Sequence, residues 1–126
     1  MKDDGRDGVM EEFKIATGQR TEMVDITGRV QELVDGSGAR DGLCVVFVPH
    51  TTAAVTINEG ADPAVRADIL AELGKVIPFD DGYTHMEGNS AGHIKTSLTG
   101  SSATVSAMLR SVFSPRAVRL SLTSVK

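Results

Sequence analysis

The segment from Val45 to Glu59, VVFVPHTTAAVTINE, most constrains how this chain can fold. Its first four residues are apolar and mostly β-branched, which predicts a strand buried on both faces. Because Pro49 cannot donate to a sheet ladder, the strand should end there. The side chains that follow are an imidazole and two hydroxyls, from His50, Thr51 and Thr52. The segment therefore predicts a functional site at the mouth of a buried strand.

The remaining patterns predict an α+β fold, with a mixed, mostly antiparallel sheet and two helices. Short apolar or alternating runs predict further strands at residues 13–15, 23–26, 55–58, 93–98, 103–107 and 117–123. One helix should run from Thr27 to Gly36, and a second from Asp62-Pro63 to Gly74. Residues 75–92 hold many turn formers and predict a long, functional loop. The chain fits a single domain over residues 11–126, after a polar, flexible tail at residues 1–10.

Composition argues against several classes of protein. A net charge of −4 and a pI near 5.3 disfavour a nucleic-acid binder, and the chain has no Trp for base stacking. No apolar run reaches the roughly 18 residues that span a bilayer, and the first residues lack the apolar core of a signal peptide. A lone cysteine, Cys44, suits a buried thiol in a reducing compartment. We therefore expect a cytoplasmic protein without a membrane or nucleic-acid partner.

The three histidines of the chain fall at informative positions: His50 at the strand mouth, His85 in the long loop and His93 at the start of the next strand. Neutral imidazoles are common zinc ligands, and three of them with an open fourth position suit a catalytic metal. Their spacing matches no short metal motif. The spacing alone favours three unrelated surface or hydrogen-bonded histidines over a shared metal site.

A second interpretation is an anion site. Hydroxyls at Thr51, Thr52 and Ser97 and the ammonium of Lys95 are donors that phosphate oxygens accept. The alternative is structural, because threonine is common in strands for its shape and Lys95 would suit a solvated face. No Gly-rich phosphate loop accompanies these residues.

Two carboxylates are candidate general bases, or partners that orient a histidine. Continuing the alternation of the strand sends Glu59 toward the edge of the core, where a carboxylate needs a partner. Asp68 lies on the second predicted helix and can reach solvent. We therefore expect Glu59 to matter more to the site than Asp68.

Three stretches together closely resemble one known family. They are VFVPHTTAAVTINEGADPAVRADIL, then Tyr83 to Asn89, YTHMEGN, and then His93 to Ser102, HIKTSLTGSS. The chain resembles the YjbQ-like family, whose members are often labelled secondary thiamine-phosphate synthase. The resemblance runs from about Thr21 to Val105. After that the family's Trp-containing strand is missing, and Ser114-Pro115-Arg116 stands where the family carries Gly-Pro-Arg.

The resemblance implies a compact α+β homotrimer with its histidine cluster near the subunit boundary, often around a metal ion. An open sheet edge would independently favour a homotrimer. The resemblance places the family's signature at His50, Thr51, Thr52, Asn58, Glu59, Asp68, His85, Asn89 and His93. The labelled activity joins a pyrimidine pyrophosphate to a thiazole phosphate and releases pyrophosphate.

We therefore expect a trimeric protein with a site for a divalent metal, zinc or magnesium, and for a small phosphorylated molecule. The expected metal ligands are His50, His85 and His93. The expected catalytic residues are Glu59, Asp68 and His50. The expected phosphate ligands are Thr51, Thr52, Asn58, Asn89, Lys95 and Arg116. The alternative is a non-catalytic protein that binds a metal or a phosphorylated ligand at the same residues.

Overall fold

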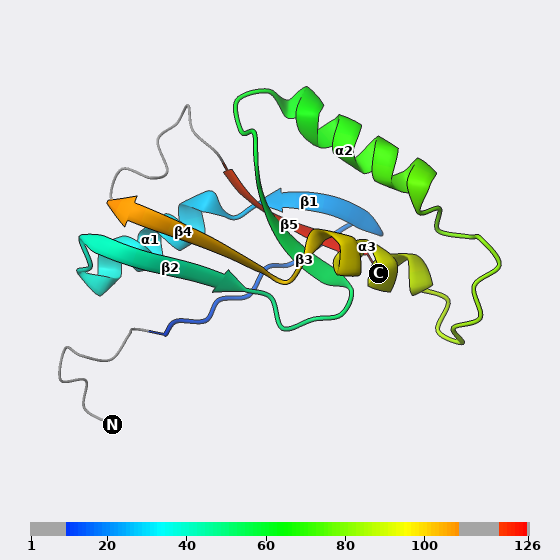
Figure 1. Cartoon of the computed structure of the whole chain (residues 1–126), viewed down its shortest axis with the longest axis horizontal. Coiled ribbons are helices and arrows are strands. Elements are labelled where there is room, and N and C mark those ends of the chain that lie inside the picture. Colours follow the sequence, from blue (N-terminus) through cyan, green and yellow to red (C-terminus); the bar gives the residue numbers. More distant parts are fainter. Residues whose placement is uncertain (1–9, 109–118, 126) are drawn as a thin grey trace.

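The computed structural model describes residues 10–108 and 119–125, with side chains described as far as residue 105. Its elements are β1 (Thr21–Asp25), α1 (Thr27–Ser37), β2 (Asp41–Phe47), β3 (Ala53–Asn58), α2 (Pro63–Val76), α3 (Ser90–Thr99), β4 (Ser102–Met108) and β5 (Arg119–Val125) (Figure 1). The α+β, single-domain architecture is confirmed. The described residues form three helices, where two were predicted.

The strands form a three-stranded sheet, in the order β1-β5-β3, and a two-stranded ribbon, β2-β4. Each described pairing is antiparallel, so the sheet is not mixed as predicted. The closing strand β5 lies between β1 and β3, with Thr123 opposite both Met23 and Ala54. Two backbone bonds link the ribbon and the sheet to the end of α3: Val48 N–H donates to Ser101 O and Val55 N–H donates to Gly100 O.

The core lies between α1 and the inner faces of the strands. Its buried members are Ile26, Val30, Val34, Val48, Ala53 and Val55. In Figure 1 α1 lies behind the ribbon, and the alternate residues Cys44 and Val46 of β2 pack against this core. Residues 13–15, predicted as a strand, form none, but Phe13 and Ile15 also pack there. The predicted strand at residues 55–58 is confirmed by β3, although Ile57 is 40% exposed. The predicted strand at residues 13–15 is wrong.

The prediction that Val45–Val48 is buried on both faces is wrong. Leu43, Val45 and Phe47 point away from the core and are 70%, 61% and 64% exposed. The reason is that, within the described part of the chain, β2 pairs with β4 alone, in a ribbon that α1 covers on one side. A continuous β-branched run suits either a doubly covered or a singly covered strand, because both favour the same residue types.

Residues 93–98, predicted as a strand, belong to the helix α3. Their short alternation also fits a helix whose buried side consists of Ala91, Gly92 and Lys95. Ser97 Oγ donates to His93 O at 2.8 Å, one helical turn back. A pattern of six residues is too short to distinguish the period of a strand from that of a helix. The contacts of this segment decide it, because α3 packs against β3 and β5 of the sheet.

The predicted start of α2 is confirmed, since Asp62 Oδ1 accepts a hydrogen bond from Ala64 N–H at 2.9 Å and Pro63 opens the first turn. The predicted ends of two helices are wrong. The helix α2 passes through Gly74 to Val76, and α1 passes through Gly36 to a left-handed Gly38 with φ 75°. A glycine inside a helix costs only about 1 kcal/mol, which neighbouring turns offset. The long loop therefore covers residues 77–89 rather than 75–92.

Candidate functional site

Two of the predicted metal ligands lie together. The rings of His85 and His93 have centroids 5.2 Å apart and planes at 83° to each other. His85 comes from the loop before α3, and His93 from the first turn of that helix. The pair lies on an open, shallow depression lined by Gly82, Tyr83, Thr84, His85, Ser90, His93 and Ile94. Two imidazoles, one from the loop and one from α3, thus line the same solvent-accessible depression.

A tight turn brings His85 back over α3. Gly88 N–H donates to His85 O at 3.1 Å, and Gly88 has φ 75°, a conformation that glycine adopts without strain. At the other end of the loop, Tyr83 Oη donates to Pro78 O at 2.7 Å, and the Arg20 guanidinium lies 4.0 Å from the centre of the Phe79 ring. These contacts hold a loop that lacks regular structure in a defined shape.

Asn89, which lies between the two histidines in sequence, carries an unsatisfied acceptor. Its Oδ1 atom is buried and has no hydrogen-bond partner among the described residues. A buried acceptor without a donor costs about 1–3 kcal/mol. A bound donor or cation at this position would remove that cost. The Glu87 carboxylate adds a weak contact, 4.0 Å from His85 Nε2 and largely exposed.

The third predicted ligand lies elsewhere. His50 and Thr51 are exposed in the loop between β2 and β3, and Thr52 is partly buried there. No group of three histidine, cysteine or carboxylate side chains within the described ranges is placed to hold a metal ion. In a single copy the structure therefore brings together two predicted metal ligands and not the third.

The predicted residues around β3 are also divided. Thr52 precedes the strand and Asn58 ends it. Six residues of extended chain span about 20 Å. The hydroxyl pair and the Asn58-Glu59 pair therefore lie at opposite ends of one strand.

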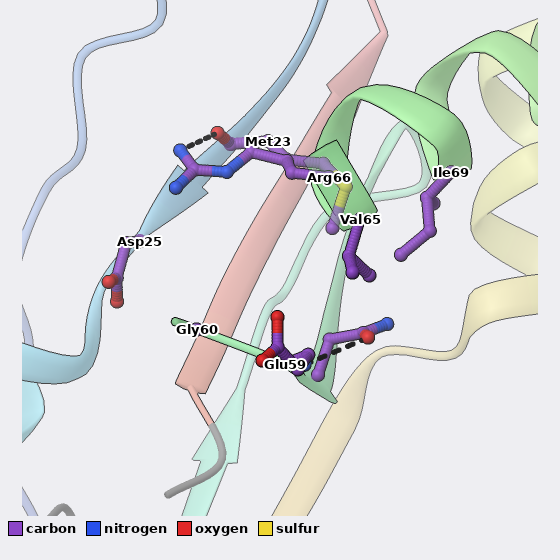
Figure 2. A pocket seen from close by; sticks show the side chains of 8 residues that line it. Met23, Asp25, Glu59, Gly60, Val65, Arg66 and Ile69 are labelled. Carbon is purple, nitrogen blue, oxygen red and sulfur yellow. Dashed lines mark hydrogen bonds between the residues drawn. The ribbon is translucent and has the colours of Figure 1, made fainter. Parts of the chain in front are cut away.

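A second depression, smaller and more enclosed, lies where α2 crosses the end of β3 and β1 (Figure 2). It is lined by Met23, Asp25, Asn58, Glu59, Gly60, Val65, Arg66 and Ile69. Arg66 Nη1 donates to Met23 O at 3.3 Å, which orients the guanidinium along the rim. Neither Asp25 nor Arg66 was predicted, because only the crossing of α2 over β1 brings them beside Glu59.

Glu59 is exposed, so the prediction that it lies at the edge of the core is wrong. Its Oε2 atom accepts a hydrogen bond from Asp62 N–H at 2.9 Å, and its own N–H donates to Asn58 Oδ1 at 2.9 Å. These bonds close the turn that leads into α2. Asp68 is exposed on α2 and does not line this depression.

The remaining predicted residues lie in different environments. Lys95 is only 4% exposed, on the side of α3 that faces the sheet, and Arg116 lies outside the described residues. Burial raises the pKa of the Cys44 thiol, which disfavours the nucleophilic thiolate. Desolvation, with a contribution from Asp81, raises the pKa of the Tyr83 phenol. Neither group is thereby activated for catalysis at neutral pH.

Burial lowers the pKa of the Lys95 ammonium, which makes a pH-dependent contribution to stability. The unfolded chain keeps this proton up to pH about 10.4. Stability should therefore rise with pH between the lowered folded pKa and that value, as the buried charge is lost. We expect Lys95→Met to raise the thermal midpoint at pH 7 and to remove this alkaline rise. Thermal melts from pH 7 to 11 would test it, and an unchanged alkaline rise in the variant would contradict it.

The family model for UPF0047 proteins, YjbQ-like, matches residues 11–110. The chain belongs to the UPF0047 family. It is 48% identical over 93 residues to a UPF0047 protein of Methanocaldococcus jannaschii, covering 74% of this chain and 67% of that protein. It is 41% identical over 95 residues to YugU of Bacillus subtilis, covering 75% and 72%.

Solved structures confirm the UPF0047 fold. An uncharacterized conserved protein of this family from Clostridium acetobutylicum shares 44% identity with a TM-score of 0.81, covering 87% of this chain and 85% of that one. A hypothetical protein from Aeropyrum pernix shares 28% identity with a TM-score of 0.83, covering 90% and 86%. The described helices of the present chain include none long and apolar enough to cross a membrane.

Proposed function

We propose that this UPF0047 protein acts as a homotrimer that binds a divalent metal and a small phosphorylated molecule beside His85 and His93. The observation that carries the proposal is the imidazole pair, with 5.2 Å between ring centroids. Asn89, whose buried Oδ1 lacks a hydrogen-bond partner among the described residues, lies between the two histidines in the sequence. Imidazole nitrogens favour zinc over magnesium, which prefers oxygen ligands. His50 from a second copy would supply the third nitrogen.

The same arrangement would suit the transfer reaction labelled for the family. Joining a pyrimidine pyrophosphate to a thiazole phosphate requires neutralisation of the charge on the departing pyrophosphate, which a bound metal would supply. Glu59 and Asp68, both exposed, are the candidate general bases. The candidate phosphate ligands are Thr51, Thr52, Asn58, Asn89, Lys95 and Arg116, of which Thr51 and Thr52 lie at the opposite end of β3 from Asn58. Lys95 is the weakest of these candidates, because its side chain is buried against the sheet.

The second candidate function is binding without turnover. The wide, open shape of the depression around His85 and His93 favours it, because efficient group transfer usually needs a site that excludes water. In that case the metal and phosphorylated ligand would bind at the same residues without reaction.

Calorimetric titration of the metal-free protein with zinc, and separately with magnesium, tests the metal site. We expect about one zinc per copy at micromolar affinity or better, and much weaker magnesium binding. Absence of zinc binding would refute the proposed site. Steady-state release of pyrophosphate from the pyrimidine and thiazole phosphates, in the zinc-loaded protein, then separates the two candidate functions. Saturable turnover supports the transferase, and zinc binding without turnover supports the binding protein.

A further inference from the structure

The loop between α2 and α3 carries an Asp-Gly pair, Asp81-Gly82, at a point where nothing holds it (Figure 1). Contacts fix the loop on either side of the pair: the Arg20 guanidinium lies over the Phe79 ring, and the Tyr83 hydroxyl donates to a backbone carbonyl. Between these contacts, Asp81 and Gly82 are exposed and outside any helix or strand. Within the described part of the chain, neither makes a hydrogen bond. The side-chain carboxyl group of the aspartate and the backbone N–H of the glycine are therefore both free to react.

The reaction open to such a pair is isomerisation of the aspartate. The glycine nitrogen attacks Cγ of the protonated carboxyl group, an N–Cγ bond forms, and the N–H proton and the carboxyl hydroxyl leave as water. The product is a cyclic succinimide. Water then adds to the backbone carbonyl of the ring, and the bond from that carbonyl to nitrogen breaks. This gives isoaspartate, in which the chain runs through Cβ and Cγ. Glycine favours ring closure because it has no Cβ to obstruct the attack.

The fold protects the other two Asp-Gly pairs that lie in the described ranges. Asp35-Gly36 lies within α1, and Asp41-Gly42 lies in β2, where the ribbon pairs it with β4. Ring closure needs a backbone conformation that neither a helix nor a strand provides, so these pairs can react only when the element opens locally. Two further pairs, within residues 4–8, lie outside the described residues.

The exposed pair borders the depression that holds His85 and His93, because Gly82 and Tyr83 line it. Isoaspartate at position 81 adds one methylene to the backbone directly before Gly82, and it moves the carboxylate onto Cα. We propose that Asp81 is a site of spontaneous isomerisation to isoaspartate, and that the lengthened backbone displaces the wall of the depression formed by Gly82 and Tyr83.

Incubation of the folded protein for several weeks at mildly acidic pH, where more of the carboxyl group is protonated, tests the site. Electron-transfer fragmentation of its peptides identifies isoaspartate, because it cleaves the Cα–Cβ bond that only the isomerised backbone contains. We expect at least about tenfold more isoaspartate at Asp81 than at Asp35 or Asp41, which must first open locally. An amount at Asp81 no greater than at those two positions would overturn the proposal.

The same incubation in guanidinium chloride shows whether the fold causes this preference. In the unfolded chain, Asp35, Asp41 and Asp81 should form isoaspartate at similar rates, because glycine follows each of them. A preference for Asp81 that persists in the unfolded chain would contradict the proposal, since the loop would then have no part in it.

Tyr83 reports on the shape of the wall, because it is the only tyrosine in a chain without tryptophan. We expect its fluorescence to change as isoaspartate accumulates in the unaltered protein. It should stay constant in Asp81→Glu, the matched control, which keeps the charge but must close a less favoured six-membered ring. Isoaspartate at position 81 without a change in fluorescence, or an equal change in both proteins, would overturn the displacement of the wall. No metal is needed, so the result does not depend on the proposed function.

Discussion

Ile26→Ala is expected to lower the free energy of unfolding by about 2–5 kcal/mol. Ile26 is 2% exposed and joins β1 to α1 at the centre of the core cluster. Truncation would leave a cavity between α1 and the sheet. The surrounding backbone is fixed by these elements, so the cavity can close only partly. The backbone bond from Val30 N–H to Ile26 O, 3.1 Å long, does not depend on the side chain and should persist.

Urea denaturation followed by circular dichroism, at one fixed protein concentration, measures this effect. The fixed concentration matters because an assembling protein gains stability by mass action. Val76→Ala provides the control, since its side chain is 65% exposed, and should change stability by less than about 0.5 kcal/mol. A loss for Ile26→Ala no larger than the control's would show that Ile26 is not in the folding core.

His93→Ala is expected to weaken zinc binding by more than about 100-fold, beyond the 10–100-fold typical for residues that only orient a ligand. The physical reason is that one copy offers two adjacent imidazoles, and the loss of either leaves a single nitrogen at the depression. Calorimetric titration of the variant measures the change. Retention of the original affinity would remove His93 from the list of ligands.

Two further variants help to interpret the result for His93→Ala, one as a control and one as a test of the third ligand. Ser97→Ala removes the hydroxyl that donates to His93 O, one turn along the same helix, and should leave zinc affinity within a fewfold of the original. His50→Ala should weaken zinc binding as strongly as His93→Ala if His50 completes the site from a second copy. Normal zinc binding by His50→Ala would limit the site to the His85 and His93 pair and its surroundings.

Local signals were sufficient to predict several elements. The Asp62-Pro63 pair predicted the start of α2, because an acceptor at the N-cap and a fixed φ at the first position act within one turn. The alternation of residues 55–58 predicted most of β3. The combined HTT, NE and H-x-E-x-N-x3-H patterns indicated the family, to which the chain belongs. The α+β architecture followed from the same patterns.

Other features depended on contacts between distant segments. Residues 93–98 form a helix because β3 and β5 offer α3 a surface to cover, and six alternating residues fit either period. Among the described residues, α1 covers one face of the ribbon and leaves the other face of β2 exposed. The sequence placed Glu59 toward the core, but the turn into α2 holds it in solvent by the bond from Asp62 N–H.

In the candidate site, too, some features follow from the sequence and others from contacts between distant segments. The sequence by itself determined which side chains have groups that a metal ion or a phosphate could bind, because those groups are a property of the residue type. Only the tertiary structure decided which of them meet: a left-handed Gly88 turns His85 toward His93, while the length of β3 separates Thr52 from Asn58. Distances between residues far apart in sequence follow from how helices and strands pack, and spacing along the chain does not encode them.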